Sequence, residues 1–221
     1  MKKIIIGALL LTSGFGLKAQ HDISVDVLGF AFSKYGLSYD YLINDQNSIG
    51  LNVNFTSKNT FSDMKNQYSF LDGDLNYSEM NIIPEFKSYL TPNKGNDGIY
   101  IGLYAKYRTS KSTDNSFIIS DVNNDDFDPT FPILKTDVSS SGFALGVMSG
   151  YKWKTSGVMF LEVTGGIGKF LSTSVSYSNS KAEDLDAEDL DENDYIPYVG
   201  NELAIDFRIN LKIGIRIGGG Q

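Results

Sequence analysis

The sequence contains no cysteine and a single histidine, His21. Without cysteine the protein can form no disulfide, and it cannot be anchored to a membrane as a cysteine-linked lipoprotein. Small barrel enzymes that act on lipids usually need a histidine with a serine or acidic partner. His21 is the only candidate and lies close to the N-terminus, so we expect neither enzymatic activity nor a cofactor.

Basic residues are also few, with 19 Lys and Arg against 27 Asp and Glu, for a formal net charge of −8. Such a chain lacks the basic surface that the phosphates of a nucleic acid require, so we expect no nucleic-acid partner. It is equally unsuited to docking onto an anionic membrane face. Beyond residue 20, no apolar run is long enough for a spanning helix.

The first twenty residues, MKKIIIGALLLTSGFGLKAQ, form a separate segment. Lys2 and Lys3 precede an apolar stretch from Ile4 to Leu11, and LKA before Gln20 resembles a signal peptidase site. We therefore predict a secretory signal peptide over 1–19 and one mature domain over 20–221, with a net charge of −11. The alternative is an N-terminal membrane anchor, but the apolar stretch is short against the ~20 residues that a spanning helix needs.

The mature chain is dominated by period-two alternation. In ELAIDFRINLKIGIRI (202–217), every odd position from Leu203 to Ile217 is apolar, whereas Asp206, Arg208 and Lys212 occupy even positions. Alternation of this kind places the two sets on opposite faces of a β-strand. Similar runs cover 23–32, 35–43, 48–57, 79–91, 99–110, 139–153, 157–175 and 201–217. The sequence therefore predicts an all-β protein with eight strands.

The connections between these runs alternate in length. Those at 44–48, 91–98 and 154–157 are short and rich in turn residues, whereas those at 58–78, 111–135 and 177–200 are long and polar. The first connection, near Ser33 and Lys34, is the one exception to the pattern. In an antiparallel meander, alternate connections lie at opposite ends, as in outer-membrane barrels. We predict an eight-stranded antiparallel up-and-down transmembrane β-barrel.

The volume of the barrel interior decides which face meets lipid. About five bulky apolar residues per strand amount to about forty side chains, and an eight-stranded barrel is only just wide enough to be filled by side chains. The opposite face is rich in glycine and suits a narrow lumen. We therefore expect the apolar face to contact lipid. Tyr41, Tyr89, Tyr151 and Trp153, near strand ends, are expected in an aromatic girdle at the membrane boundary.

The same alternation places five acidic and six basic residues in the lumen. Near-balance indicates a paired, hydrogen-bonded network, because an unpaired charge in a confined interior is costly. The alternatives are an ion or proton relay, an ion-selective pore, or acid–base chemistry by a carboxylate pair such as Asp40 and Glu85. The predicted lumen residues are Asp26, Asp40, Glu85, Lys87, Lys106, Arg108, Glu162, Asp206, Arg208, Lys212 and Arg216.

Two of the long connections carry clusters of acidic residues. The segment 182–194 repeats AEDLD and could hydrate the rim or bind Ca²⁺ or a basic partner. The acidic residues of the two repeats are Glu183, Asp184, Asp186, Glu188, Asp189 and Asp191. In the earlier connection, Asp121, Asn123 and Asp125 match the first three ligand positions of a Ca²⁺ loop. Asp126 replaces the expected glycine and Pro132 the final glutamate, so we predict no metal site.

Three segments carry a resemblance to a known family. These are LGFAFSKYGLSYDYLINDQNSIGLNVNF (28–55), IIPEFKSYLTPNKGNDGIYIGLYAKYR (82–108) and GFALGVMSGYKWKTSGVMFLEVTGGIGKF (142–170). They resemble the small eight-stranded outer-membrane β-barrels of Bacteroidota, many of which are catalogued as a domain of unknown function. The resemblance implies an architecture similar to that of small porin-like and adhesin-like barrels.

These observations lead to one functional hypothesis and three alternatives. We expect a monomeric, non-enzymatic barrel in the cell outer membrane, with outer-membrane lipid as its partner and a lumen plugged by charge pairs. Its long external loops would serve the envelope or contact an external surface or ligand. The alternatives are a narrow pore or transporter for small solutes, a lipid-modifying enzyme, and a soluble secreted binding barrel.

Overall fold

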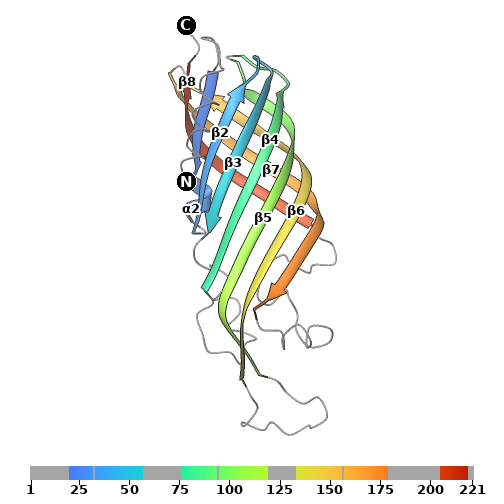
Figure 1. The fold of residues 1–221 in the computed structure, drawn as a ribbon. Helices are drawn as coiled ribbons and strands as arrows, with labels where there is room; N and C mark the ends of the chain where they lie inside the picture. The colour runs from blue at the N-terminus through green and yellow to red at the C-terminus, as the bar shows by residue number, and fades with distance from the viewer. Residues whose placement is uncertain are drawn as a thin grey trace, which may run out of the picture.

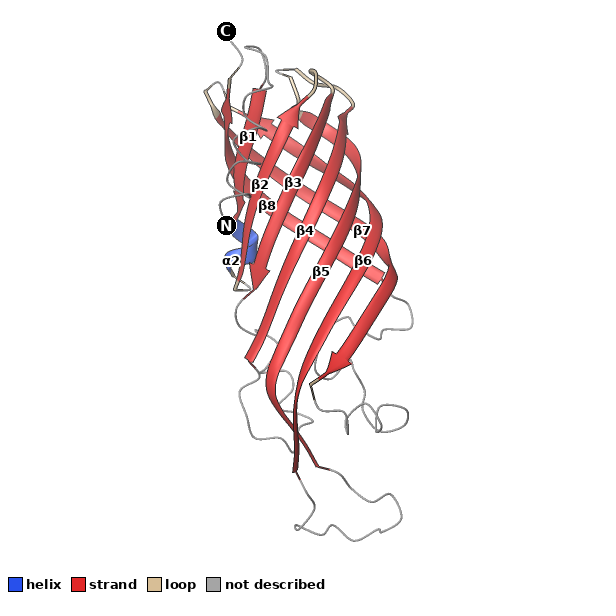
Figure 2. Ribbon diagram, in the orientation of Figure 1, coloured by secondary structure: helices blue, strands red, loops and turns tan. Residues whose placement is uncertain are grey.

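The computed structural model describes residues 20–31, 33–56, 76–93, 95–118, 133–155, 157–178 and 205–218. These ranges contain eight strands and one short helix (Figures 1 and 2). The elements are β1 (Gln20–Asp26), α2 (Val27–Phe30), β2 (Lys34–Leu42), β3 (Asn47–Thr56), β4 (Asn76–Tyr89), β5 (Gly98–Ile118), β6 (Ile133–Lys154), β7 (Met159–Tyr177) and β8 (Ile205–Ile217). The predicted signal peptide lies outside the described residues.

The eight strands form a single closed barrel in sequence order. Each strand pairs antiparallel with the next, and β8 closes the barrel on β1 from His21↔Ile217 to Asp26↔Lys212. Where all eight strands are paired on both sides, closure leaves no sheet edge with unpaired backbone groups. The all-β class and the eight-stranded up-and-down barrel are therefore confirmed.

Alternation governs how the strands are oriented, as β5 illustrates. Ile99, Ile101 and Leu103 are exposed on the outer face, whereas Tyr100 and Tyr104 between them are buried inside. In β8 the exposed residues Phe207 and Ile209 alternate in the same way with Asp206 and Arg208. The sequence prediction that bulky apolar residues face outward and polar residues inward is confirmed for these strands.

The first predicted strand, 23–32, ends earlier than expected. β1 stops at Asp26, and one helical turn, α2, follows it. The Asp26 carboxylate accepts a hydrogen bond from the Gly29 backbone N–H at 3.3 Å, as an N-cap does. Local capping therefore outweighs the apolar alternation at this point. Within the described ranges no helix is long and apolar enough to cross a bilayer.

The strands are unequal in length, and β5 and β6 extend beyond their predicted bounds. Pairing between them continues through Lys111↔Ser139 to Ile118↔Ile133, with a register shift between Ser112 and Asn115. Here backbone pairing continues where the apolar alternation has ended, so the apolar pattern underestimated the length of both strands. In Figure 1 these two strands project farthest at the lower end.

The two rims of the barrel differ in their connections. The short turns 43–46, 90–97 and 155–158 lie at one rim, together with the start of β1 and the end of β8 (Figure 1). We call this the turn rim. Helix α2 and the strand ends bordering 57–75, 119–132 and 179–204 lie at the opposite rim, which we call the loop rim.

Candidate functional site

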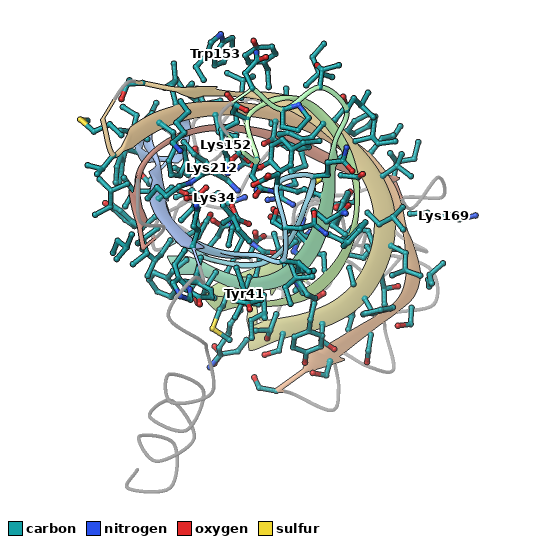
Figure 3. All side chains as sticks on the ribbon, turned by 90° about the horizontal axis from the view of Figure 1, so that it is seen from above. Lys34, Tyr41, Lys152, Trp153, Lys169 and Lys212 are labelled. Carbon is teal, nitrogen blue, oxygen red and sulfur yellow. The ribbon has the colours of Figure 1, made fainter. Side chains whose placement is uncertain are left out.

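Among the described residues, the lumen is lined by charged side chains in equal numbers of each sign. All eleven residues predicted for it are buried, together with Asp22, Asp97 and Lys152, which the prediction omitted. Figure 3, which looks down the barrel, shows Lys152 and Lys212 inside the ring and Trp153 and Lys169 outside it. The seven buried acids are Asp22, Asp26, Asp40, Glu85, Asp97, Glu162 and Asp206, and the seven buried bases are Lys87, Lys106, Arg108, Lys152, Arg208, Lys212 and Arg216.

Glu162 of β7 is the centre of the largest cluster. One carboxylate oxygen lies 2.9 Å from Lys87 Nζ, and the other lies 3.0 Å from Lys152 Nζ. The Tyr100 hydroxyl also donates to this carboxylate at 2.9 Å. Lys87 binds Asp40 at 2.9 Å as well, so each ammonium lies between carboxylates. We call Asp22, Asp40, Lys87, Lys152 and Glu162 the central cluster.

Glu85 lies beside the central cluster and links it to β8. Its carboxylate accepts a hydrogen bond from the Arg208 guanidinium, and its second oxygen lies 3.5 Å from Lys87 Nζ. Lys212 Nζ lies 3.7 Å from Glu85 and 3.9 Å from Glu162 and makes no hydrogen bond within the described part of the chain. Lys212 therefore interacts with these two carboxylates through charge and not through a hydrogen bond.

At the turn rim, Arg216 forms hydrogen bonds to the β4–β5 turn at the mouth of the barrel. Its guanidinium donates to both oxygens of Asp22, at 2.6 and 2.7 Å. The same group donates to the backbone carbonyls of Gly95 and Asn96 in the β4–β5 turn. Asn96 is 1% exposed, so this turn is packed into the mouth. Arg216 thus connects the turn to the lumen network.

Toward the loop rim the charges form separate pairs. Lys106 Nζ donates to Asp206 at 2.6 Å, and the Tyr104 hydroxyl donates to the second oxygen of the same carboxylate at 2.8 Å. Arg108 lies 3.0 Å from Glu79, which is partly exposed. Asp26 accepts from the Asn210 side chain while it caps α2. The predicted residues therefore form several local groups along the lumen and not one continuous cluster.

Interior glycines provide the space for interior aromatic rings. A Cβ atom at Gly168 would lie 2.7 Å from the Tyr104 hydroxyl, and one at Gly166 would lie 3.3 Å from the Tyr104 ring. Tyr100 lies against Gly150 in the same manner. Tyr104 packs with Ile83 and Met148 in a small apolar cluster. The small residues noted in the sequence thus leave room for large side chains from nearby strands.

Tyr89 does not belong to the aromatic girdle, so that prediction is wrong for this residue. It is 2% exposed, points into the lumen and packs against Tyr100 with ring centroids 5.2 Å apart. Tyr89 has an odd residue number, as Glu85 and Lys87 do, and therefore lies on the same face of β4. This alternation, which we call parity, decides the orientation of Tyr89 although the residue lies at the end of the strand. Tyr151 and Trp153 are exposed on the outer face and lie with their rings 4.4 Å apart.

Parity also explains the residues that the prediction missed. Asp22 has the parity of Asp26 on β1, and Lys152 has that of Gly150 on β6, so both could have been placed in the lumen. The contact of Lys152 with Glu162 follows from the β6–β7 register, in which the two residues lie opposite each other. The contact of Lys152 with Asp22 of β1 could not have been named, because only barrel closure brings β1 and β6 near each other.

Several other candidate residues lie outside the described residues. These are the partial Ca²⁺-loop residues Asp121, Asn123 and Asp125 and the acidic-loop residues Glu183, Asp184, Asp186, Glu188, Asp189 and Asp191. In the described part of the chain, no three His, Cys, Asp or Glu side chains are grouped so as to hold a metal ion. His21 Nδ1 lies 2.7 Å from the Tyr39 hydroxyl at the outer surface.

The outer face forms a continuous apolar belt. Each of the eight strands contributes exposed aliphatic or aromatic side chains, including Leu103 on β5, Phe207 on β8 and Ile209 on β8, the last being 72% exposed. Monomeric soluble proteins rarely expose apolar patches beyond a few hundred Å². The molecule therefore combines a charged, paired interior with an apolar exterior, the reverse of a soluble protein.

Comparisons with known proteins place the chain in a family. No curated protein matches it. Among solved structures it is similar to Neisserial surface protein A (10% identity, 91% of this chain and 93% of that chain, TM-score 0.42). It is also similar to CarO of Acinetobacter baumannii (13% identity, 92% of this chain and 98% of that chain, TM-score 0.39). A third similar structure is a major outer membrane protein of Thermus thermophilus (13% identity, 90% of this chain and 99% of that chain, TM-score 0.40). A family model matches residues 5–208, most of the sequence, and the chain therefore belongs to the family described as "Protein of unknown function (DUF3575)".

Proposed function

We propose that this protein is a non-enzymatic β-barrel of the bacterial outer membrane, with a lumen closed by ion pairs. The supporting observation is the apolar belt around all eight strands. Each Å² of apolar surface left in water costs roughly 25 cal/mol, so a belt of this size is favourable only against acyl chains. Barrel closure satisfies the backbone groups, as crossing a bilayer requires.

The pairing inside the barrel supports a closed lumen. Within the described ranges, seven buried acids face seven buried bases, and the central cluster ties β1, β2, β4, β6 and β7 together. Eight strands leave an interior that side chains can fill, whereas aqueous channels are typical of about sixteen strands. We infer that the lumen network is structural and that the protein conducts no steady ion current.

The loop rim carries the proposed surface role. If the short turns face the periplasm, as in known outer-membrane barrels, the long connections face outward. The acidic residues of 182–194 would then be presented to the exterior, where they could hydrate the surface or contact an external surface or ligand. We propose that the barrel acts as a monomer that displays these connections or supports the envelope.

The membrane proposal is tested by fractionation and gel migration. We expect the protein in the detergent-extracted membrane fraction, with unheated samples migrating differently from boiled ones, because a closed barrel resists SDS until heated. Recovery in the soluble fraction without detergent would overturn the proposal and favour the soluble binding barrel. Equal migration of heated and unheated samples would contradict a closed barrel.

The closed lumen is tested by conductance in planar lipid bilayers. We expect no steady channel from the wild-type protein, because ion pairs of the central cluster cross the lumen and Arg216 binds the β4–β5 turn at its mouth. A reproducible steady conductance would overturn the structural assignment of the network and support the narrow pore. Heat-modifiable protein must be used, so that silence cannot result from unfolded chains.

A further inference from the structure

The belt contains a groove of about 700 Å³ on its outer face, across β4 to β7. One side is formed by four bulky residues that lie in register on adjacent strands, namely Phe86, Leu103, Val147 and Ile167. The neighbouring outward-facing row consists of Ser88, Ile101, Ser149 and Gly165, so its side chains are small or absent on β4, β6 and β7 but bulky on β5. The groove therefore arises where short side chains of the belt stand beside the row of bulky ones.

Gly165 is the most open of the three glycines that line this groove. A Cβ atom added there would meet nothing within 4 Å, and the backbone of Gly165 is not in the left-handed region. No packing or dihedral requirement thus explains a glycine, although glycine in a strand lowers stability because it costs entropy and packs nothing. The Ser149 hydroxyl is satisfied by the backbone carbonyl of Tyr100 at 3.0 Å, so it offers no free donor.

We propose that this groove binds one acyl chain of a membrane phospholipid. The inference rests on the proposed membrane location and deepens it, because the groove is continuous with the belt that faces acyl chains. No charged side chain lines the groove, so it offers no ion pair to a headgroup and favours the hydrocarbon tail. The four strands span about 14 Å at the usual strand spacing, enough for a substantial part of a tail.

Filling the groove is the direct test of this proposal. Gly165→Phe places a ring in the open space without a backbone clash, and Gly165→Leu does so with a smaller side chain. Thr109→Phe is the matched control, because Thr109 faces outward on β5, well away from the groove. All three variants should remain heat-modifiable, since each only adds apolar volume to the outer face.

The measurement is native mass spectrometry of the detergent-purified mature chain after incubation with 1-palmitoyl-2-oleoyl phosphatidylethanolamine. We expect one retained phospholipid on the wild-type protein and on Thr109→Phe. Gly165→Phe should weaken retention at least about ten-fold, since excluding only about two methylenes from apolar contact has that effect. Gly165→Leu should give an intermediate loss.

Two results would overturn the proposal. Equal phospholipid retention by the wild type, Gly165→Phe and Thr109→Phe would show that the groove holds no tail. A wild-type dimer that dissociates in Gly165→Phe would assign the groove to a second copy of the chain. Either result, obtained with protein from the membrane fraction, leaves the membrane proposal intact, whereas protein that is not membrane-associated would contradict both.

Discussion

Neutralising Glu162 should destabilise the barrel more than any comparable change at its surface. Glu162→Gln keeps the shape and the acceptor for Tyr100, but it removes the negative charge between Lys87 and Lys152. Removing one partner of a buried ion pair typically costs about 3–5 kcal/mol, because the other charge stays buried. Asp40 and Asp22 still contact these lysines at 2.9 and 3.0 Å, so we expect the lower end, about 3 kcal/mol.

The assay is denaturant unfolding of the barrel in detergent or lipid, followed by the fluorescence of Trp153, the single tryptophan. Asp137→Asn is the matched control, because Asp137 pairs with Lys111 at 2.9 Å where both side chains are substantially exposed. Exposed pairs contribute about 0–1 kcal/mol. A Glu162→Gln protein that loses no more than Asp137→Asn would refute the view that the network stabilises the barrel.

A second substitution separates charge balance from packing. Lys152→Met, added to Glu162→Gln, removes one charge of each sign and keeps an extended apolar side chain in place of the lysine. Removing both charges leaves neither of them buried without its partner, so the double variant should lose less unfolding free energy than the two single variants combined. Additive losses would indicate that Lys152 and Glu162 act independently, contrary to the 3.0 Å contact between them.

Three further predictions test other parts of the structure. Gly168→Ala should lower the free energy of unfolding by about 1–3 kcal/mol, since its Cβ would lie 2.6 Å from a backbone oxygen of β6. Gly165→Ala should be neutral or stabilising, and equal unfolding free energies for the two variants would contradict the assigned strand faces. Ile209→Arg should lower the free energy of unfolding in lipid by about 2–4 kcal/mol if this exposed residue lies near the bilayer midplane. An unchanged free energy of unfolding would argue against lipid contact. Arg216→Ala should accelerate hydrogen exchange of the Asn96 amide, because the β4–β5 turn loses its guanidinium donor; unchanged exchange would show that the turn is held by other contacts.

The fold could be predicted because each strand carries its orientation in every second residue. Alternation distinguishes Ile209 from Arg208 without any knowledge of their neighbours, and the volume of a narrow barrel then assigns the apolar set to the exterior. The same reasoning failed at Tyr89, where an aromatic residue at a strand end was assigned to the girdle although Glu85 and Lys87 share its parity. The position of a residue along a strand therefore predicts the orientation of its side chain less reliably than its parity does.

The partners within the lumen could not be predicted from the sequence. Lys87 and Glu162 are 75 residues apart, and their contact depends on the register of strands that are not adjacent in the barrel. A shift of one residue in one strand pair would direct one of these side chains to the lipid. Alternation predicts which residues are inside, whereas barrel closure and register decide which of them meet.

The distribution of charge within the structure limits where a function can reside. The buried acids and bases form ion pairs, and Arg216 at the turn rim donates to the β4–β5 turn. If the lumen is closed, as we propose, its side chains are engaged with one another and would leave little freedom to bind or transport a solute. Under that proposal, recognition would use the outer surface, either the groove across β4 to β7 or the connections at the loop rim. Of the two, the groove can be tested with single substitutions, because Gly165 can be filled without disturbing the lumen network.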